Sequence, residues 1–286
     1  MVRNSGDRLF GAFSYIVLAI VGLAAVVPLL YVFSVSLTPF AEVLRHGGYV
    51  LIPKELTFSA YKKLLGTSAI PRSLAVTVYI TVIGTAINLV LTALIAYPLS
   101  RRQLPGRRYF LLMVVFTLLF SGGIIPTYLV VKATGLIDSL WSLILPTAVS
   151  SFNVLIMKSF FEQLPEELFE SARIDGAKEF RILFRIVVPL SLPVMVTVGL
   201  FYAVGHWNSF FSAIMYVTDR TLYPLQVVVR EILMLSQQPL ENAEDQVPTV
   251  TMQMAAVVFA SLPVLIVYPF LQKHFTKGML LGSIKG

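Results

Sequence analysis

Six long apolar stretches, almost free of acidic and basic residues, constrain the fold of this chain more than any other feature. They cover residues of about 9–38, 73–100, 109–131, 139–158, 187–218 and 247–272. About 20 apolar residues are enough for a helix to cross the hydrocarbon core of a membrane. Helices also satisfy their own backbone hydrogen bonds in lipid. We therefore expect an all-α integral membrane protein with six transmembrane helices, which form a single transmembrane domain over residues 1–286.

The composition excludes several other classes of protein. Charged residues make up only 13% of the chain, whereas soluble domains carry about 25%. The absence of cysteine excludes disulfide frameworks and thiolate chemistry. A net charge of +7 could indicate nucleic-acid binding. In a membrane protein, however, it is more typical of basic residues kept on the cytoplasmic side, so we expect lipid and no nucleic acid as a partner.

The distribution of basic residues predicts the topology. Six spans place both termini on one side of the membrane. Together with the arginine-rich turn at 101–108 and the stretch 158–185, that side holds 14 of the 22 Lys and Arg residues. The positive-inside rule makes it the cytoplasmic side of an inner membrane. The first apolar run is too long for a signal peptide and ends without a small-residue cleavage site, so we expect it to be retained.

A charged stretch at residues 162–189 lies between the fourth and fifth runs. Pro165 followed by two glutamates favours a helix start, because proline fits the first turn and carboxylates stabilise the positive end of the helix dipole. We expect this helix to end near Ile174, with a turn at Asp175-Gly176. A second helix follows, with an apolar stripe at Phe180, Leu183, Phe184 and Val187.

An amphipathic loop lying on the bilayer surface is an alternative for this stretch. Such helices are usually rich in Lys and Arg on the polar face. Here the first helix carries mainly glutamate, which an anionic leaflet would repel. The acidic helix is better suited to the basic surface of a soluble partner protein.

The same stretch resembles the EAA loop of ABC importer permease subunits. The resemblance rests on Glu170-Ser171-Ala172, on Gly176 four residues later, and on Ile186-Val187-Val188-Pro189; Ser171 and Val188 depart from the alanine and leucine of the family pattern. It implies two coupling helices that dock into a cleft of a separate cytoplasmic ATPase. Glu170 would then pair with a basic group, Ala172 would allow close packing, and Gly176 would make the bend. The implied coupling residues are Glu170, Ser171, Ala172, Asp175, Gly176, Ile186 and Pro189.

Two further segments resemble the maltose-type carbohydrate branch of this family. The segment His206-Trp207-Asn208-Ser209-Phe210-Phe211 is similar to its Trp-Asn-x-Phe segment. The C-terminal Gly282-Ser283-Ile284-Lys285-Gly286 is similar to the tail of the second permease subunit. That tail reaches into the ATPase dimer, so the resemblance implies ATPase contacts at Gly282, Ser283 and Lys285. It is nearest to a subgroup that serves complex oligosaccharides, including alginate-type uronates.

The resemblance implies a permease subunit of an ATP-driven, binding-protein-dependent carbohydrate importer that works by alternating access. Its partners would be a homologous second permease subunit, two cytoplasmic ATPase subunits and an extracytoplasmic solute-binding protein. The chain has no phosphate-binding Gly-rich loop, so ATP and Mg would be bound by the partner subunits, with no cofactor on this chain. It also lacks a nucleophile elbow and a His-Glu-x-x-His motif, so it is not expected to be an enzyme.

Polar residues within the apolar runs are candidates for a substrate path, because such residues usually face the bundle interior or a water-filled cavity. They are Asn88, Asn153, Tyr202, His206, Trp207 and Asn208. Helix–helix hydrogen bonding for the amides and an interfacial position for Trp207 are the alternatives. His206 has no second ligand nearby in the sequence, so no metal site is expected.

A secondary transporter or channel driven by an ion gradient is the alternative function. Such proteins usually need a carboxylate or a charge pair at mid-membrane depth. None of the six apolar runs contains Asp or Glu. The sequence therefore favours the ATP-driven permease.

Overall fold

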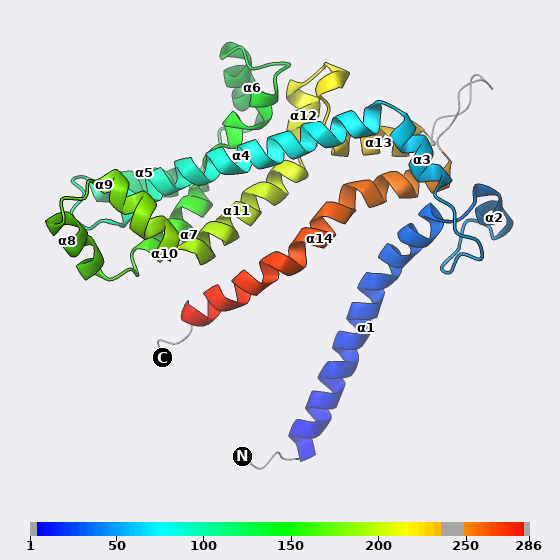
Figure 1. Ribbon diagram of the computed structural model, residues 1–286, viewed down its shortest axis with the longest axis horizontal. Coiled ribbons are helices and arrows are strands. Elements are labelled where there is room, and N and C mark those ends of the chain that lie inside the picture. Colours follow the sequence, from blue (N-terminus) through cyan, green and yellow to red (C-terminus); the bar gives the residue numbers. More distant parts are fainter. Residues whose placement is uncertain (1–4, 236–248, 283–286) are drawn as a thin grey trace. The chain divides into compact units, whose positions relative to one another are not determined.

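The computed structural model describes residues 5–235 and 249–282, and in these ranges it is helical without a β-strand (Figure 1). The chain divides into two compact units. The first combines Met1–Ile70 with Val229–Leu262, and the second combines Pro71–Val228 with Pro263–Gly286. The charged stretch at 162–189 and the predicted substrate-path residues all lie in the second unit.

The first unit contains the N-terminal helix α1 (Ser5–Ser36), two short helices, α2 (Phe40–Arg45) and α3 (Ser59–Gly66), and the first part of α14 (Val250–Gly282). Its small core joins the end of α1 to α2 and α14 through Val35, Val43 and Met254. The apolar part of α1 before this core is exposed over its length. Such a helix needs lipid or another chain to cover its apolar surface.

The second unit is built on the long helix α4 (Ala69–Ser100). The elements that follow it are α5 (Arg107–Leu119), α6 (Ile124–Ala133), the 3₁₀ turns η1 (Leu140–Leu143) and η2 (Leu145–Thr147), α7 (Ser151–Phe161), α8 (Glu166–Ile174), α9 (Glu179–Ile182), the π-turn η3 (Leu183–Val187), α10 (Val188–Leu190), α11 (Leu192–Trp207), α12 (Phe211–Tyr216), η4 (Arg220–Leu222) and α13 (Leu225–Leu235). Its main core packs α4, α7, α8, α9 and α11 together.

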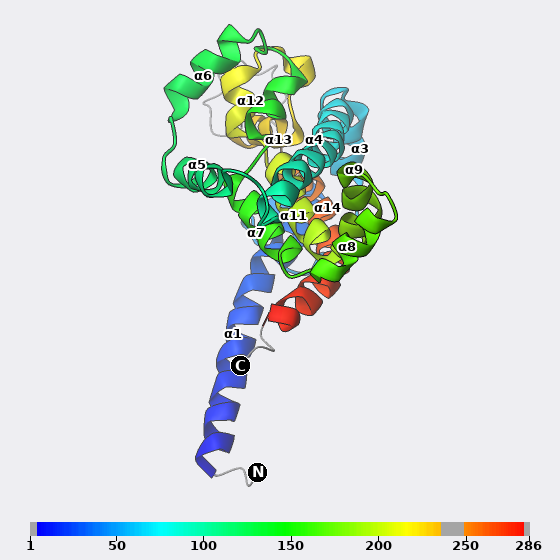
Figure 2. The ribbon, with the colours of Figure 1, turned by 90° about the vertical axis from the view of Figure 1, so that its left-hand side faces the viewer.

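Three helical segments in the described residues are long and apolar enough to cross a membrane unbroken: Phe10–Ser36, Ala69–Ser100 and Val250–Val267. Three further helix pairs pass the same test as bent pairs. The bends are 113° between α5 and α6, 52° between η1–η2 and α7, and 87° between α9–α10 and α11. Figure 2 shows the sharp turn from α5 to α6.

The break between α5 and α6 falls where Gly122-Gly123 and Pro126 predict a kink. Gly123 has a φ of +85°, which only glycine adopts without strain. The runs at 139–158 and 187–218 also break, although the sequence suggested continuous helices. Ser150 caps α7 by accepting a hydrogen bond from Asn153 N, and α11 ends at Trp207 with Asn208 as its C-cap. Each run is therefore apolar along its whole length, although the helix within it is interrupted.

Candidate coupling surface and polar cavity

Helix α8 begins at Glu166, directly after Pro165, and ends at Ile174, as the sequence predicts. The turn that follows contains Gly176 with a φ of +74°, so the need for glycine at this bend is confirmed. Figures 1 and 2 both show α8 and α9 beside the end of α4. The charged stretch is therefore a helix–turn–helix held against the long helix of this unit.

One face of α8 is buried within its own chain. Phe169 is completely buried in the main core, and Ala172, three residues later, is only 6% exposed. The resemblance implied that Ala172 allows close packing at an ATPase contact. In the structure Ala172 instead faces the chain's own core, because it lies on the same side of the helix as Phe169. Its small side chain lets α8 approach the neighbouring helices.

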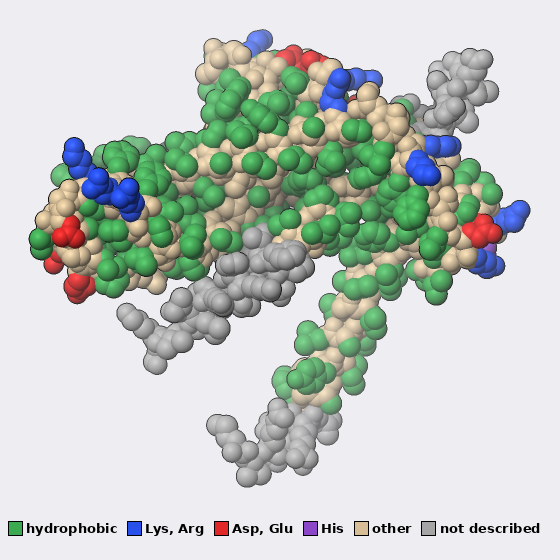
Figure 3. Space-filling model, viewed as in Figure 1, with side chains coloured by type: hydrophobic (Ala, Val, Ile, Leu, Met, Phe, Trp, Pro, Cys, Tyr) green, Lys and Arg blue, Asp and Glu red, His purple; other side chains and the backbone are tan. Residues whose placement is uncertain are grey.

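The opposite face of α8 is exposed and combines acidic with apolar side chains. Glu170 and Ser171 are exposed, and Glu170 forms no ion pair with any residue that the structure describes. Ile174 is 86% exposed, and Phe180 beyond the turn is 69% exposed. Figure 3 shows acidic and basic side chains gathered at this end of the unit, while apolar side chains line the flank of α4. A partner with basic and apolar groups would fit this surface.

The predicted apolar stripe of the second helix is half wrong. Leu183 and Val187 are buried, but Phe180 and Phe184 are exposed, and Ile182 is buried in their place. The reason is the π-turn η3, whose i→i+5 hydrogen bonds change the phase of the helix. Of the remaining predicted coupling residues, Asp175 and Pro189 are exposed and Ile186 is half-buried.

Ion pairs tie the charged stretch to the arginine-rich turn at 101–108. Arg101 Nη1 lies 3.2 Å from Glu166 Oε2, and Arg107 pairs with Glu162. Within the stretch, Arg173 Nε lies 3.2 Å from Glu179 Oε1. Burial lowers the pKa of the Arg101 guanidinium below its usual value. The sequence indicated the turn only as a topological anchor, and the ion pairs show that it also holds the start of α8 in place.

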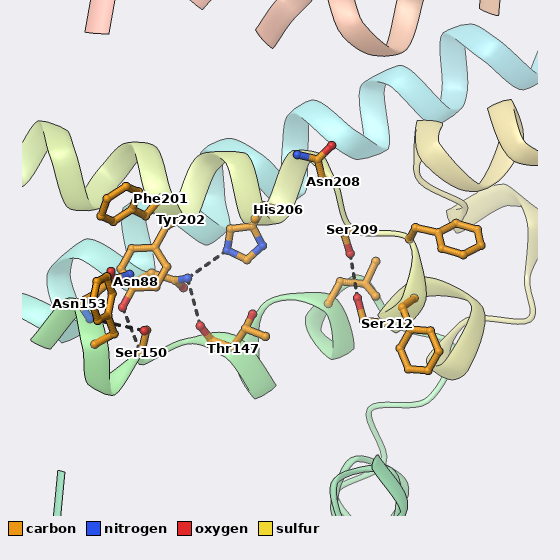
Figure 4. Close-up of a pocket in the computed structure, with 15 residues that line it drawn as sticks. Asn88, Thr147, Ser150, Asn153, Phe201, Tyr202, His206, Asn208, Ser209 and Ser212 are labelled. Carbon is orange, nitrogen blue, oxygen red and sulfur yellow. Dashed lines mark hydrogen bonds between the residues drawn. The ribbon is translucent and has the colours of Figure 1, made fainter. Parts of the chain in front are cut away.

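A cavity of about 530 Å³ lies in the same unit, between α4, the η2–α7 segment and the α11–α12 segment (Figure 4). It is lined by Asn88, Leu143, Thr147, Ser150, Phe152, Asn153, Phe201, Tyr202, Gly205, His206, Asn208, Ser209, Phe210, Phe211 and Ser212. These described residues include no Asp, Glu, Lys or Arg. The wall therefore combines amides, hydroxyls and aromatic rings without a fixed charge.

Five of the six residues that the sequence assigns to the substrate path line this cavity, namely Asn88, Asn153, Tyr202, His206 and Asn208. Trp207 does not. It lines a separate, mainly apolar cavity of about 650 Å³ against α4. Successive helical residues point about 100° apart, so Trp207 faces away from the cavity that His206 lines.

Hydrogen bonds across the polar cavity connect α4 with α11. Asn88 Nδ2 lies 3.1 Å from His206 Nε2 and donates to the Thr147 carbonyl at 3.2 Å. The Tyr202 hydroxyl lies 2.7 Å from Thr92 Oγ1 and accepts a hydrogen bond from Ser150 N at 3.0 Å. Figure 4 shows Asn88 and His206 turned toward each other. Asn88, Tyr202 and His206 thus line the cavity and bond the helices at the same time.

Gly84 is a site residue that the sequence did not suggest. It lies one helical turn before Asn88, and the His206 ring packs directly on its backbone. A Cβ at this position would lie 2.6 Å from His206 Nε2. Only glycine therefore leaves room for the imidazole between α4 and α11.

Asp138 closes a clasp elsewhere in the same unit, outside the polar cavity. Its carboxylate accepts hydrogen bonds from Thr218 N at 2.5 Å, from Thr218 Oγ1 at 2.6 Å and from Asp219 N at 3.0 Å. Its own N–H donates to the Tyr216 carbonyl, and its φ is +57°. The clasp joins the segment after α6 to the segment after α12.

Asp138→Asn is expected to open this clasp, because an amide group cannot accept all three hydrogen bonds. The amide protons of Thr218 and Asp219 should then exchange with solvent at least about tenfold faster, as local opening becomes easier. Asp219→Asn is the matched control, since that carboxylate caps only Thr221 N. Unchanged exchange in the Asp138 variant would contradict the clasp.

The pH dependence follows from the same hydrogen bonds, which lower the pKa of Asp138. A lowered pKa contributes stability above the ordinary aspartate value of about 3.9. That contribution is lost as the pH falls through the folded-state pKa. We therefore expect protection of the Thr218 amide to be constant from pH 7 to about pH 4 and to decline only below it.

The described residues contain no group of three or more His, Cys, Asp or Glu side chains that could hold a metal ion. Of the three predicted tail contacts, Gly282 is the last residue of α14, while Ser283 and Lys285 lie outside the described residues.

These features define a class of protein: a helical membrane component with an exposed acidic and apolar helix face and an uncharged polar cavity. Residues 88–281 match the family described as "binding-protein-dependent transport system inner membrane component", and the chain belongs to this family. It is therefore a multi-pass inner-membrane permease of an ABC transport system, and not the ATP-hydrolysing subunit.

Two relatives from Bacillus subtilis (strain 168) match over nearly their whole length. Protein LplC is 46% identical over 290 residues, which cover 100% of this chain and 98% of LplC. The polygalacturonan/rhamnogalacturonan transport system permease protein YtcP is 47% identical over 285 residues, which cover 98% of this chain and 99% of YtcP.

A solved structure of a bacterial ABC transporter involved in the import of the acidic polysaccharide alginate contains a similar chain. The match has a TM-score of 0.88 and 32% identity, and it covers 96% of this chain and 99% of that chain. A bacterial alginate ABC transporter in complex with its alginate pentasaccharide-bound periplasmic protein also matches, with a TM-score of 0.56 and 13% identity. This second match shows only the shared fold.

Proposed function

We propose that this chain is one permease subunit of an ATP-driven importer for acidic oligosaccharides such as uronate oligomers. The coupling part of the proposal is carried by the two faces of α8, one buried and one exposed. Its inner face is fixed in the chain's own core, and its outer face presents Glu170 and Ile174 without a partner in the described residues. The substrate class is supported by the similarity to the polygalacturonan/rhamnogalacturonan permease.

In this proposal the outer face of α8 docks into a cytoplasmic ATPase subunit. Two such subunits would bind ATP and Mg, and their closure would move α8 as a rigid body. The spans would be six if each bent pair counts as one, with both termini in the cytoplasm. A homologous second permease subunit and lipid would cover the apolar flanks, and an extracytoplasmic binding protein would deliver the substrate.

The uncharged cavity is proposed as this subunit's part of the substrate path. Aromatic faces such as Phe201 suit the C–H faces of sugar rings, and Asn88, Asn153 and Asn208 suit their hydroxyl groups. His206 is the one lining residue with an imidazole ring, whose N–H can donate a hydrogen bond to a carboxylate. It would be the group nearest in chemistry to a uronate carboxylate. Trp207 is left out of the path because it faces the apolar cavity.

Reconstitution tests the proposal. The chain, its homologous subunit and the ATPase pair are assembled in proteoliposomes, and uptake of labelled oligogalacturonate is measured with ATP and the substrate-loaded binding protein. We expect uptake only when all components and ATP are present. Uptake by the chain alone, driven by a proton or sodium gradient, would instead identify a secondary transporter.

A further inference from the structure

Arg101 occupies an unusual position for an arginine next to the end of a membrane helix. It directly follows α4, yet its side chain is only 11% exposed. Its guanidinium carbon lies 3.3 Å from the centre of the Phe169 ring in α8, and Nη1 lies 3.2 Å from Glu166 Oε2. A planar guanidinium can stack on an aromatic ring and pair with a carboxylate at once, which a lysine does less well. Arg101 thus holds α8 by two contacts of different kinds.

The helix that Arg101 terminates also reaches the polar cavity. One turn before Arg101, Tyr97 donates a hydrogen bond to Glu179 in α9. Farther along the helix, Thr92 and Asn88 bond Tyr202 and His206 of α11. At 1.5 Å per residue, Asn88 lies roughly 20 Å from Arg101 along a continuous helix. One helix therefore connects the coupling surface with the cavity.

A displacement of α8 can reach the cavity by two routes. The covalent route runs through α9, the π-turn η3 and the 87° bend before α11. The second route runs through side chains from α8 into α4. If only α11 moved, the pairs Asn88–His206 and Thr92–Tyr202 would slide apart. Contacts between α8 and α4 would make the two walls of the cavity move together.

Stability alone explains Arg101 poorly. Its Nε–H is buried without an acceptor among the described residues. A buried donor without a partner destabilises the fold, and such groups call for another explanation.

We propose that Arg101 is a positioning residue that transmits the movement of α8 to α4, and thereby to the wall of the transport cavity. The inference rests on the proposed function, in which α8 docks to the ATPase. The inference adds a specific set of contacts, between the Arg101 guanidinium, the Phe169 ring and the Glu166 carboxylate. Through these contacts, movement of the docked α8 would be transmitted to the substrate path.

The test uses the complete importer in proteoliposomes and measures both ATP hydrolysis and uptake. Arg101→Met removes the charged, planar guanidinium group while keeping a long side chain. Arg101→Lys keeps the positive charge but loses the planar group. Phe169→Leu removes the ring but keeps an apolar group in the core. Arg102→Met is the matched control, because Arg102 is exposed and forms no ion pair in the part of the chain that the structure describes.

We expect Arg101→Met and Phe169→Leu each to lower uptake per ATP hydrolysed by about tenfold, within the usual range of coupling between sites. Basal ATP hydrolysis and assembly with the ATPase should persist. The double variant should be little worse than either single one, because both remove the same contact. Arg101→Lys should recover part of the uptake, and Arg102→Met should behave as wild type.

Normal uptake per ATP in both Arg101→Met and Phe169→Leu would overturn the inference. A parallel loss of assembly, hydrolysis and uptake in both variants would also overturn it, since that pattern indicates a structural role only. Failure of the proposed function is distinguishable. In that case the wild-type assembly itself would show no ATP-dependent uptake.

Discussion

Glu170→Lys is expected to lower substrate uptake by at least about 100-fold, equivalent to about 2.7 kcal/mol of lost interaction, while the chain still inserts into the membrane. Glu170 lies on the exposed face of α8 and has no ion pair in the described residues. A lysine there would face the basic partner surface that an acidic helix selects, and like charges across an interface cost several kcal/mol. Uptake and co-purification of the ATPase subunits measure the effect.

Two variants control this prediction. Glu170→Gln removes the charge without reversing it and should have a smaller effect. Glu55→Lys reverses an exposed charge in the first unit and should leave ATPase association unchanged. Exposed substitutions of this kind usually change folding stability by no more than about 0.5 kcal/mol. If Glu170→Lys keeps both normal uptake and normal ATPase association, the coupling role of α8 is wrong.

Gly84→Ala is expected to destabilise the chain by about 1–3 kcal/mol, the usual cost of overpacking a close contact. The added Cβ would lie 2.6 Å from His206 Nε2 and 2.8 Å from Cε1, so the ring must move. Movement of the ring breaks the hydrogen bond with Asn88 and changes the cavity wall. Denaturation in detergent should report the loss of stability, and uptake should fall with it.

The control for this prediction is Gly22→Ala, where a Cβ would meet no described atom within 4 Å. That change should be neutral or slightly stabilising, because alanine favours the helix by up to about 1 kcal/mol over glycine. The double variant Gly84→Ala/His206→Ala removes the ring that causes the clash. The double variant should lose less stability than the sum of the losses in the two single variants. Strict additivity would show that the two residues do not meet as the structure places them.

Local sequence signals predicted the charged stretch well. Pro165 and the glutamates after it set the start of α8, and Gly176 set its turn, because these residues act on their own backbone. The break between α5 and α6 followed from glycine and proline in the same way. Such features need no knowledge of distant contacts.

Contacts between distant segments were not predictable. The pairing of Arg101 with Phe169 and the fit of His206 against Gly84 join residues that are far apart in the sequence. Hydropathy also measures how apolar a run is, and not whether its helix is continuous, so the ends of α7 and α11 were missed. The π-turn η3, which begins at Leu183, was missed for a similar reason: no residue type in the sequence predicts it, and it changes the phase of the helix within the predicted apolar stripe.

If the polar cavity is the proposed substrate path, its absence of fixed charge has a consequence for the movement of a sugar chain. A wall of amides, hydroxyls and aromatic rings offers several weak binding contacts and no fixed charge that would bind a ligand tightly. Passage through a pore requires such shallow, repeated binding, because a ligand held too tightly does not leave. A polymer could then advance ring by ring with little friction. Nothing in the cavity itself would favour one direction, so the inward bias must be imposed on it from outside.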